Sequence, residues 1–297
     1  MTTQTKLGWD DLVAGQALGS YQLAQSQADV EEFQDVVDPR GDIYDESGWA
    51  NLAYDTLHAV KQFVDLPQGT VHSKEAVAFH HPIDPSTECL VDVAVADRFT
   101  RRGRPGFVIE NRITSGEEHC MTVYKTFVLP GTSEESDTQG NRAFDFGLFD
   151  MDLGEPDMPG IALESYEIPI NQNLIDRFGK VTATDGPIHS DPAVATPIYG
   201  GTLLQAMYIF EIATQAMSRL SSVSRWSVSG KIAAKIVGST ISGESVTVAA
   251  RVHEVVINEA ARAMCSITAT TNNGKTVFLA RADAPLEAIR LIKDVRP

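Results

Sequence analysis

The chain has 297 residues, 43% of them hydrophobic and 22% charged, and a formal net charge of −16 at pH 7. This charge argues against a nucleic-acid partner, because phosphate binding needs an excess of Lys and Arg, and no apolar run is long enough to span a membrane. The first residues, MTTQTKLGWDDLVAG, lack the apolar core of a secretion signal. Cys89, Cys120 and Cys265 are odd in number and have no CxxC spacing. We therefore expect a cytoplasmic protein without disulfides or zinc, and without a membrane partner.

The first half of the chain is predicted to begin with a short amphipathic helix over residues 28–38, where apolar side chains recur on one face. A longer helical run follows over residues 48–64. Turn-forming sequences, RRGRPG and SGEEH, then separate runs of the kind found in hairpin strands. Three strands are predicted here, at residues 89–99, 106–114 and 121–129.

Residues 131–157 have the composition of a linker. They hold eight acidic residues against a single arginine, and they contain Gly, Ser and Pro at turn-forming positions. We expect a solvated connection that has no further role.

The second half repeats the order of the first. A short amphipathic helix is predicted over residues 173–183, with apolar residues at the same spacing as before. The longer run over residues 200–220 is apolar on nearly every face, so it must be buried on all sides, most easily inside a curved sheet. Strands separated by turns such as NNGK are predicted at residues 244–256, 262–271 and 276–284.

Each half therefore reads as a long helix with an antiparallel sheet. The two halves are related by an offset of about 150 residues, which indicates a divergent internal duplication.

Two segments of the second half resemble the sequence signature of a known enzyme family. The segments PIHSDPAVA and YGGTLLQAM are similar to the signature of the MaoC-like, R-specific enoyl-CoA hydratases (hydratase 2). That signature is Ser-Gly-Asp-x-Asn-Pro-x-His-x-Asp, then Ala, then Phe-Gly-Gly-x-Ile-Ala-His-Gly-Met at the start of a buried helix. The matching residues are Pro187, Ile188, His189, Asp191, Pro192, Ala195, Tyr199, Gly200, Gly201 and Met207.

The resemblance implies an α+β double hot-dog fold, in which two antiparallel sheets each wrap a long central helix. Residues 1–130 would form an N-terminal hot dog, residues 131–165 the acidic linker, and residues 166–297 the C-terminal hot dog with the catalytic motif. The first half resembles the degenerate N-terminal domain of the family. It has no His-x-Asp motif, and DPRGDIYDESG stands in the corresponding place.

Two positions depart from the family pattern. The family aspartate lies five residues before the histidine, where this chain has Thr184, and Asp185 comes one residue later. The His-Gly pair at the helix start is replaced by Gln205 and Ala206. Either Asp185 or Thr184 fills the acid–base position.

Hydration of an α,β-unsaturated thioester needs a base for water, an acid for the α carbon and donors for the enolate oxygen. Asp185 and His189 are the candidate catalytic pair, because both side chains can reach one cleft across a short Gly-Pro loop. Thr184 can position water but cannot act as a base. Alternatively, Asp185 shapes a turn and His189 bonds loop backbone. Asp191 is expected to cap the following turn.

The start of the buried helix is the candidate oxyanion and substrate-binding region. The Ala206 amide can donate to the enolate oxygen from the positive end of the helix. Gly200 and Gly201 allow close approach of a thioester, or simply form a tight turn. Tyr199 and Gln205 can add hydrogen bonds to substrate, or pack.

Coenzyme A carries phosphates, and Arg101, Arg102 and Arg104, together with Arg98, form the densest basic cluster of the chain. We favour a solvated hairpin tip as the explanation of this cluster and keep phosphate binding as the alternative. Adjacent strand residues such as His80 and His81 face opposite ways, so no metal site is expected.

These residues predict a hydro-lyase that needs no cofactor and acts on a 2-enoyl-CoA or 3-hydroxyacyl-CoA thioester. The resemblance adds room for a bulky or unusual acyl group. Two alternatives stay open: a hydratase or lyase for a small molecule that is not a CoA thioester, and a decayed acyl-thioester binding protein. The two halves form a pseudo-dimer in one chain, and further pairing of chains is left open.

Overall fold

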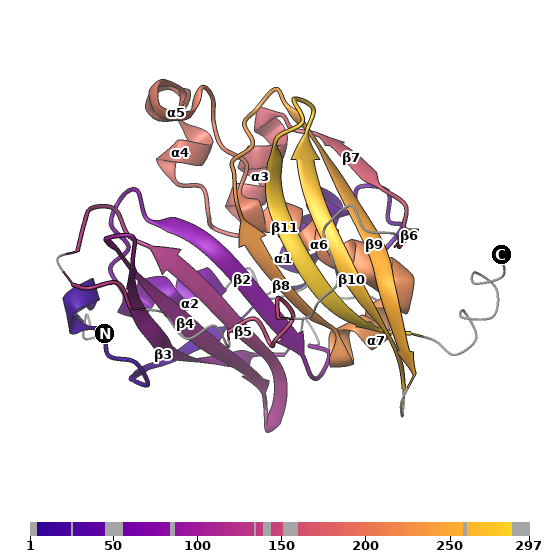
Figure 1. Cartoon of the computed structure of the whole chain (residues 1–297), viewed down its shortest axis with the longest axis horizontal. Helices are drawn as coiled ribbons and strands as arrows, with labels where there is room; N and C mark the ends of the chain where they lie inside the picture. Colours follow the sequence, from indigo (N-terminus) through magenta and orange to yellow (C-terminus); the bar gives the residue numbers. More distant parts are fainter. Residues whose placement is uncertain are drawn as a thin grey trace.

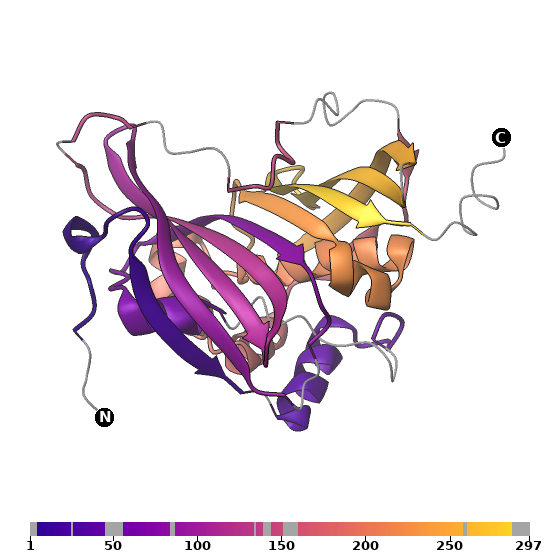
Figure 2. The ribbon, with the colours of Figure 1, turned by 90° about the horizontal axis from the view of Figure 1, so that it is seen from below.

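The computed structural model describes residues 5–24, 26–44, 56–83, 87–133, 135–138, 144–150, 160–257 and 260–286. Eleven antiparallel strands form one sheet with the order β1-β3-β4-β5-β2-β8-β11-β10-β9-β6, and β7 pairs with β9. The main helices lie together on one side of this curved sheet (Figures 1 and 2). No helix in the described part of the chain is long and apolar enough to cross a membrane.

Among the described residues, the first half contributes five strands and three short helical segments. They are η1 (Trp9–Asp11), β1 (Ala17–Leu23), α1 (Gln27–Val37), α2 (Thr56–Phe63), β2 (Val71–Phe79), β3 (Cys89–Arg101), β4 (Arg104–Ser115) and β5 (Glu118–Val128). The predicted helix over residues 48–64 is seen from Thr56 onward, and residues 48–55 lie outside the described residues.

In the second half, the part that the structure describes contributes six strands and five helices. They are β6 (Ile161–Ala162), β7 (Tyr166–Pro169), α3 (Gln172–Val181), α4 (Pro187–Ser190), α5 (Pro192–Tyr199), α6 (Ala206–Ser221), α7 (Val223–Ser229), β8 (Lys231–Ile236), β9 (Ser245–Ile257), β10 (Ala261–Thr271) and β11 (Thr276–Pro285).

The two sheets expected from the sequence are joined into one. Strand β2 of the first half pairs with β8 of the second, with Ala76 opposite Ala233. We call this pairing the seam. It satisfies the backbone groups of two strands that would otherwise be unpaired sheet edges. The hot-dog architecture with antiparallel strands is thus present, but as one continuous sheet.

The long apolar run of the second half becomes a helix later than expected. Helix α5 ends at Tyr199 and is capped by Gly200, whose φ of 88° is left-handed. Leu203 then forms a bridge with Ile241. Helix α6 therefore starts at Ala206. It is buried on all sides, as its composition predicted, and Phe210 is 0% exposed.

Part of the predicted linker is packed against the sheet. Leu148 is 3% exposed and lies in a cluster with Ala76, Ala233 and Met264, which spans the seam. In Figure 2 this segment, residues 144–150, lies on the opposite side of the sheet from the helices. The small alanines on the outer face leave room for its apolar side chains, so this part of the connection is not simply solvated.

The strand order runs alike outward from the seam in both halves. It is β2, β5, β4, β3 in the first half and β8, β11, β10, β9 in the second, which agrees with the repeated plan predicted from the sequence. Helices α1 and α3 of the two halves meet, and the rings of Phe33 and Phe178 lie with centroids 6.1 Å apart.

Candidate active site

The predicted dyad lies in residues 182–191, between α3 and α5, which we call the dyad loop. Pro187 occupies the first turn of α4, a position where its missing N–H costs nothing. The Asp191 carboxylate caps α5 by accepting a hydrogen bond from the Ala193 N–H at 2.8 Å. Figure 1 shows α4 and α5 projecting from the body of the molecule.

His189 is held in one orientation by a backbone carbonyl. Its Nδ1 lies 2.8 Å from the Leu203 oxygen, and since a carbonyl can only accept, Nδ1 carries the proton. In the neutral ring Nε2 then has a free lone pair, as a base requires. Burial is the largest influence on the imidazole and lowers its pKa, which favours the neutral form.

Asp185 is exposed, and its negative charge opposes in small part the lowering of the His189 pKa that burial causes. Its backbone packs against α3, where a Cβ added to Gly179 would come within 3.2 Å of the Asp185 Cα. The Ser190 hydroxyl donates to the Asp185 carbonyl at 2.9 Å. The carboxylate is thus carried on a backbone that is fixed by close packing.

Thr184 takes part in the internal hydrogen bonds of the dyad loop. Its N–H donates to the Gly179 carbonyl at 2.8 Å, and its hydroxyl lies 2.7 Å from that of Thr182. Its carbonyl accepts a hydrogen bond from the Gln205 Nε2 at 3.3 Å. These contacts give Thr184 a structural part in the loop.

The amino end of α6 lies beside the dyad loop. Gln205 precedes the helix, is 4% exposed, and donates from Nε2 to the carbonyls of Ile175 and Thr184. Its Oε1 is buried and has no hydrogen-bond partner among the described residues. The amides of Ala206 and Met207, in the first turn, have no acceptor within the helix. Two backbone N–H donors, those of Ala206 and Met207, and the unpaired Gln205 Oε1 acceptor are therefore available at the start of α6.

The segment between α5 and α6 brings the backbone close to His189 again. Tyr199, at the end of α5, is 39% exposed, and a Cβ on Gly201 would lie 3.4 Å from Ile241. The Leu203 N–H donates to the Ile188 carbonyl at 3.0 Å. Gly200 and Gly201 thus form a tight turn that brings the Leu203 carbonyl to the imidazole.

The basic cluster lies at the β3–β4 hairpin in the other half. The Asp137 carboxylate accepts hydrogen bonds from the N–H groups of Arg102 and Gly103, which close the hairpin tip. The side chains of Arg101, Arg102 and Arg104 are exposed. No hydrogen bond or ion pair connects them to the dyad loop within the described residues.

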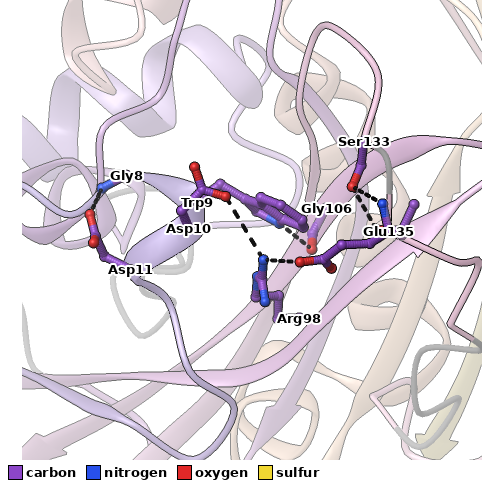
Figure 3. Close-up of polar contacts among 9 residues, drawn as sticks. Gly8, Trp9, Asp10, Asp11, Arg98, Gly106, Ser133 and Glu135 are labelled. Carbon is purple, nitrogen blue, oxygen red and sulfur yellow. Dashed lines mark hydrogen bonds and ion pairs between the residues drawn. The ribbon is translucent and has the colours of Figure 1, made fainter.

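Arg98 is already occupied by other groups. Its guanidinium lies over the Trp9 ring, 3.7 Å from the centroid, and forms ion pairs with Glu135 at 2.8 Å and Asp10 at 4.0 Å (Figure 3). Of the four arginines in this cluster, all of them described in the structure, the three at the tip remain for an anionic ligand.

The corresponding loop of the first half is filled by a buried network. The Tyr44 hydroxyl donates to the carboxylate of Glu211 on α6, which is 0% exposed and also accepts from Thr214 and Gln215. The Asp38 carboxylate accepts from the N–H groups of Asp42, Ile43 and Tyr44. Burial and the Glu211 charge raise the pKa of Tyr44. We call these contacts the Tyr44–Glu211 network; they tie the described part of this loop, up to Tyr44, to α6 of the other half.

Two residues of the first half interact with the dyad and were missed from the sequence. His58 and Lys61, on α2, are half-buried. Burial, assisted by the Lys61 charge, lowers the pKa of both His58 and His189, and the Asp185 charge partly opposes this shift. Their spacing, three residues apart on one helix face, was the available signal, but nothing in the sequence connected that face to a loop in the other half.

In the part of the chain that the structure describes, no group of three or more His, Cys, Asp or Glu side chains is placed to hold a metal ion. His80 and His81 both donate their backbone N–H to the Cys120 carbonyl, and the His80 ring packs on that of His119.

Comparison with known proteins supports the fold. No protein-family model and no curated protein matches the sequence. A solved structure of a MaoC-like dehydratase is 16% identical and has a TM-score of 0.68, over 91% of this chain and 98% of the other. A MaoC-like dehydratase from Phytophthora capsici is 12% identical with a TM-score of 0.72, over 94% and 99% of the two chains.

A conserved hypothetical protein from Mycobacterium tuberculosis, described as a double hotdog fold, is 12% identical with a TM-score of 0.59, over 95% and 99% of the two chains. At these identities the likenesses show the fold. They confirm the double hot-dog resemblance drawn from the motif.

Proposed function

We propose that this chain, which has the double hot-dog fold found in MaoC-like dehydratases, is a hydro-lyase that reversibly hydrates a 2-enoyl-CoA to a 3-hydroxyacyl-CoA. The observation that carries the proposal is the hydrogen bond of 2.8 Å between His189 Nδ1 and the Leu203 carbonyl. This bond orients Nε2 as a base beside an acidic side chain and the amino end of a buried helix.

In the proposed mechanism one water molecule lies between His189 Nε2 and the Asp185 carboxylate. His189 takes a proton from the water as its oxygen bonds to the β carbon, and the dyad returns a proton to the α carbon on the same face. The Ala206 amide, at the positive end of α6, stabilises the enolate oxygen of the thioester. Gln205, Tyr199, Gly200 and Gly201 form the substrate-binding wall, and Thr184 holds the loop.

The substrate is proposed to be a CoA thioester with a bulky or unusual acyl group, whose phosphates reach Arg101, Arg102 and Arg104. The division into residues 1–130, 131–165 and 166–297 is kept, because strands β1–β5 and β7–β11 fall on either side of residues 131–165, and only the two-residue strand β6 lies within them among the described residues. A cytoplasmic location is also kept, since Cys89, Cys120 and Cys265 are free and buried.

The test is to incubate the protein with crotonyl-CoA and longer enoyl-CoAs and to follow the loss of the conjugated absorbance. His189→Ala and Asp185→Asn are expected to lower kcat by about 100-fold or more, because each removes a proton-transfer group. Thr184→Val keeps the shape and is expected to retain most of the rate. Absence of turnover with every thioester would refute the proposal, whereas collapse in Thr184→Val alone would transfer the acid–base position to Thr184.

The phosphate contact is tested by comparing enoyl-CoA with the same acyl group on N-acetylcysteamine, which has no phosphates. Replacing the three tip arginines by glutamine is expected to raise KM several-fold for the CoA thioester and to leave the truncated thioester unaffected. Lys180→Gln, on the exposed side of α3, serves as a control for a lost positive charge elsewhere. Equal KM values for the CoA thioester before and after the substitutions would contradict phosphate binding at the hairpin.

A further inference from the structure

The side chain of Gln172, the first residue of α3, joins three segments around the dyad loop. Its Nε2 donates to the His189 carbonyl at 2.9 Å and to the carboxylate of Asp176, one turn further along α3, at 2.7 Å. Its Oε1 accepts a hydrogen bond from the Thr202 hydroxyl. Both N–H groups and the oxygen of this amide are therefore engaged. We call these three hydrogen bonds the Gln172 clamp.

The two ends of the Gln172 amide cannot be exchanged. The His189 carbonyl and the ionised Asp176 carboxylate only accept hydrogen bonds, so Nε2 must face them, and the Thr202 hydroxyl then donates to Oε1. The bond to Asp176 joins residues four apart on one helix face, which holds the side chain against α3. The clamp is thus anchored on a helix and directed at the site.

Thr202 connects the clamp to the segment between α5 and α6. It is 3% exposed, and its carbonyl accepts from the Ser242 N–H at 2.9 Å. On the other side of Leu203, the Leu204 N–H donates to the Thr240 carbonyl at 2.9 Å. The backbone that carries the Leu203 carbonyl is therefore fixed at both neighbouring residues.

His189 is held by its backbone as well as by its ring. Its N–H donates to the Gly186 carbonyl at 2.8 Å, and its carbonyl accepts from Gln172. The neighbouring Ile188 carbonyl accepts from the Leu203 N–H at 3.0 Å. The hydrogen bond from His189 Nδ1 to the Leu203 carbonyl thus forms between two backbone segments that Gln172 joins from a third element.

We propose that Gln172, together with the Thr202 hydroxyl, is a positioning residue that selects the tautomer of His189 with the proton on Nδ1. It acts through the backbone, because it holds the His189 carbonyl and Thr202 at the separation that keeps the Leu203 carbonyl within reach of Nδ1. The proposal rests on the proposed function for the role of His189 as a base, and on the hydrogen bonds alone for the tautomer.

The arrangement has a direct chemical consequence. In an unconstrained neutral histidine the proton lies mainly on Nε2, and a hydrogen-bond acceptor at Nδ1 is needed to reverse this preference. The Leu203 carbonyl serves only while its distance and angle to the ring are kept. Each molecule that has the proton on Nε2 lacks the lone pair that would take a proton from water.

The first half supplies a matched control. Gln27 is the first residue of α1, and its Nε2 donates to Glu31, four residues further on, at 3.1 Å. Gln27 is exposed and is not a member of the clamp. Gln172→Met and Gln27→Met therefore remove the same kind of helical hydrogen bond from the same helix position, and Gln172→Met also removes the contacts to His189 and Thr202.

The first test needs no substrate. Protein labelled with nitrogen-15 at histidine is studied by NMR at a pH where His189 is neutral, and His189→Gln assigns the signals. The wild type is expected to carry the proton on Nδ1, Gln172→Met to show a clear share on Nε2, and Gln27→Met to match the wild type. A wild type protonated on Nε2, an unchanged tautomer in Gln172→Met, or an equal change in Gln27→Met would overturn the proposal.

The second test changes the other end of the clamp. Thr202→Val removes the hydroxyl that donates to Gln172 and nearly keeps the side-chain shape, whereas Thr202→Ser keeps the hydroxyl. Thr202→Val is expected to move the His189 proton toward Nε2, and Thr202→Ser to keep the wild-type tautomer. Equal spectra for these two variants would overturn the role of the hydroxyl. This comparison decides the question even if Gln172→Met does not fold.

Enoyl-CoA kinetics connect the tautomer with catalysis. Gln172→Met is expected to lower kcat about tenfold with KM nearly constant, because the clamp holds a proton-transfer group and does not contact the substrate. Gln27→Met should keep the wild-type values. A wild-type kcat in Gln172→Met with a changed tautomer would overturn the positioning role. If the wild type turns over no thioester, the proposed function fails, and the NMR comparison alone decides on the clamp.

Discussion

Asp185 owes its position to a residue on the preceding helix. Gly179 lies where α3 meets the dyad loop, and a side chain there would come within 2.8 Å of Gln205 Nε2 and 3.2 Å of the Asp185 Cα. Ala183, with a φ of 45°, then turns the chain through a left-handed conformation that non-glycine residues seldom adopt. The loop is therefore specified by close contacts rather than by local propensity.

This packing predicts the behaviour of Gly179→Ala. Alanine normally stabilises a helix by up to about 1 kcal/mol relative to glycine, but here the methyl group must displace Gln205 or Asp185. We expect kcat to fall about tenfold while the free energy of unfolding changes by less than about 1 kcal/mol. Enoyl-CoA kinetics and urea denaturation measure the two effects.

Lys180→Ala, the next residue on the exposed side of α3, should change neither quantity appreciably. Wild-type kinetics in Gly179→Ala would show that the loop moves without loss of function and would contradict the account of Asp185.

The sequence could predict His189 and Pro187, because both belong to a local motif. It could not predict the Leu203 carbonyl as the partner of His189, because that contact depends on the turn at Gly200. The burial of Gln205 also comes from tertiary packing. A local motif identifies candidate residues of the site. The hydrogen bonds that orient them join residues far apart in the chain and depend on the folded structure.

At the scale of elements, apolar periodicity located α1, α3 and strands β3–β5 and β9–β11, but it did not predict β1 or the two seam strands β2 and β8, and it misjudged two further segments. The run over residues 200–220 looks helical throughout, yet its first residues form a turn and a bridge to Ile241. The acidic stretch over residues 131–157 looks solvated, yet Leu148 packs over the seam. In both segments the conformation depends on packing against residues that are distant in the chain. This packing cannot be read from a single sequence.

The packing of Leu148 predicts a loss of stability on truncation. Leu148→Ala should lower the free energy of unfolding by about 2–4 kcal/mol, the usual range when a buried leucine leaves a cavity. Urea denaturation measures this change, and Ser136→Ala, at an exposed position of the same stretch, should have little effect. A change below about 0.5 kcal/mol in Leu148→Ala would mean that the segment is not anchored on the sheet.

At the scale of the whole molecule, the seam joins the strands of the two halves into a single sheet. A buried ion pair lies close to it: the Lys125 Nζ is 2.7 and 2.9 Å from the two oxygens of Glu75, and both residues are 1% exposed. Glu75 lies on β2, opposite Ala234 of β8. Charges removed from water in this way are stable only as a matched pair.

Breaking this pair should therefore weaken the junction. Glu75→Gln leaves the Lys125 ammonium buried without a counter-charge and should cost about 3–5 kcal/mol of unfolding free energy. The double variant Glu75→Leu with Lys125→Met removes both charges and should recover most of that loss. Thermal or urea unfolding that is unchanged in Glu75→Gln would show that the pair does not stabilise the seam.

The Tyr44–Glu211 network joins residues from different halves of a single chain, and this limits the route by which it can arise. In a dimer of identical subunits each substitution enters both active sites at once, so a tyrosine and a glutamate that filled one would also fill the other. Covalent fusion removes that constraint, because each site can then change without its twin. One site can be replaced by a stably packed interior while the other site keeps its histidine. The asymmetry is thus closed to a dimer of identical subunits and open to a single chain that carries both halves.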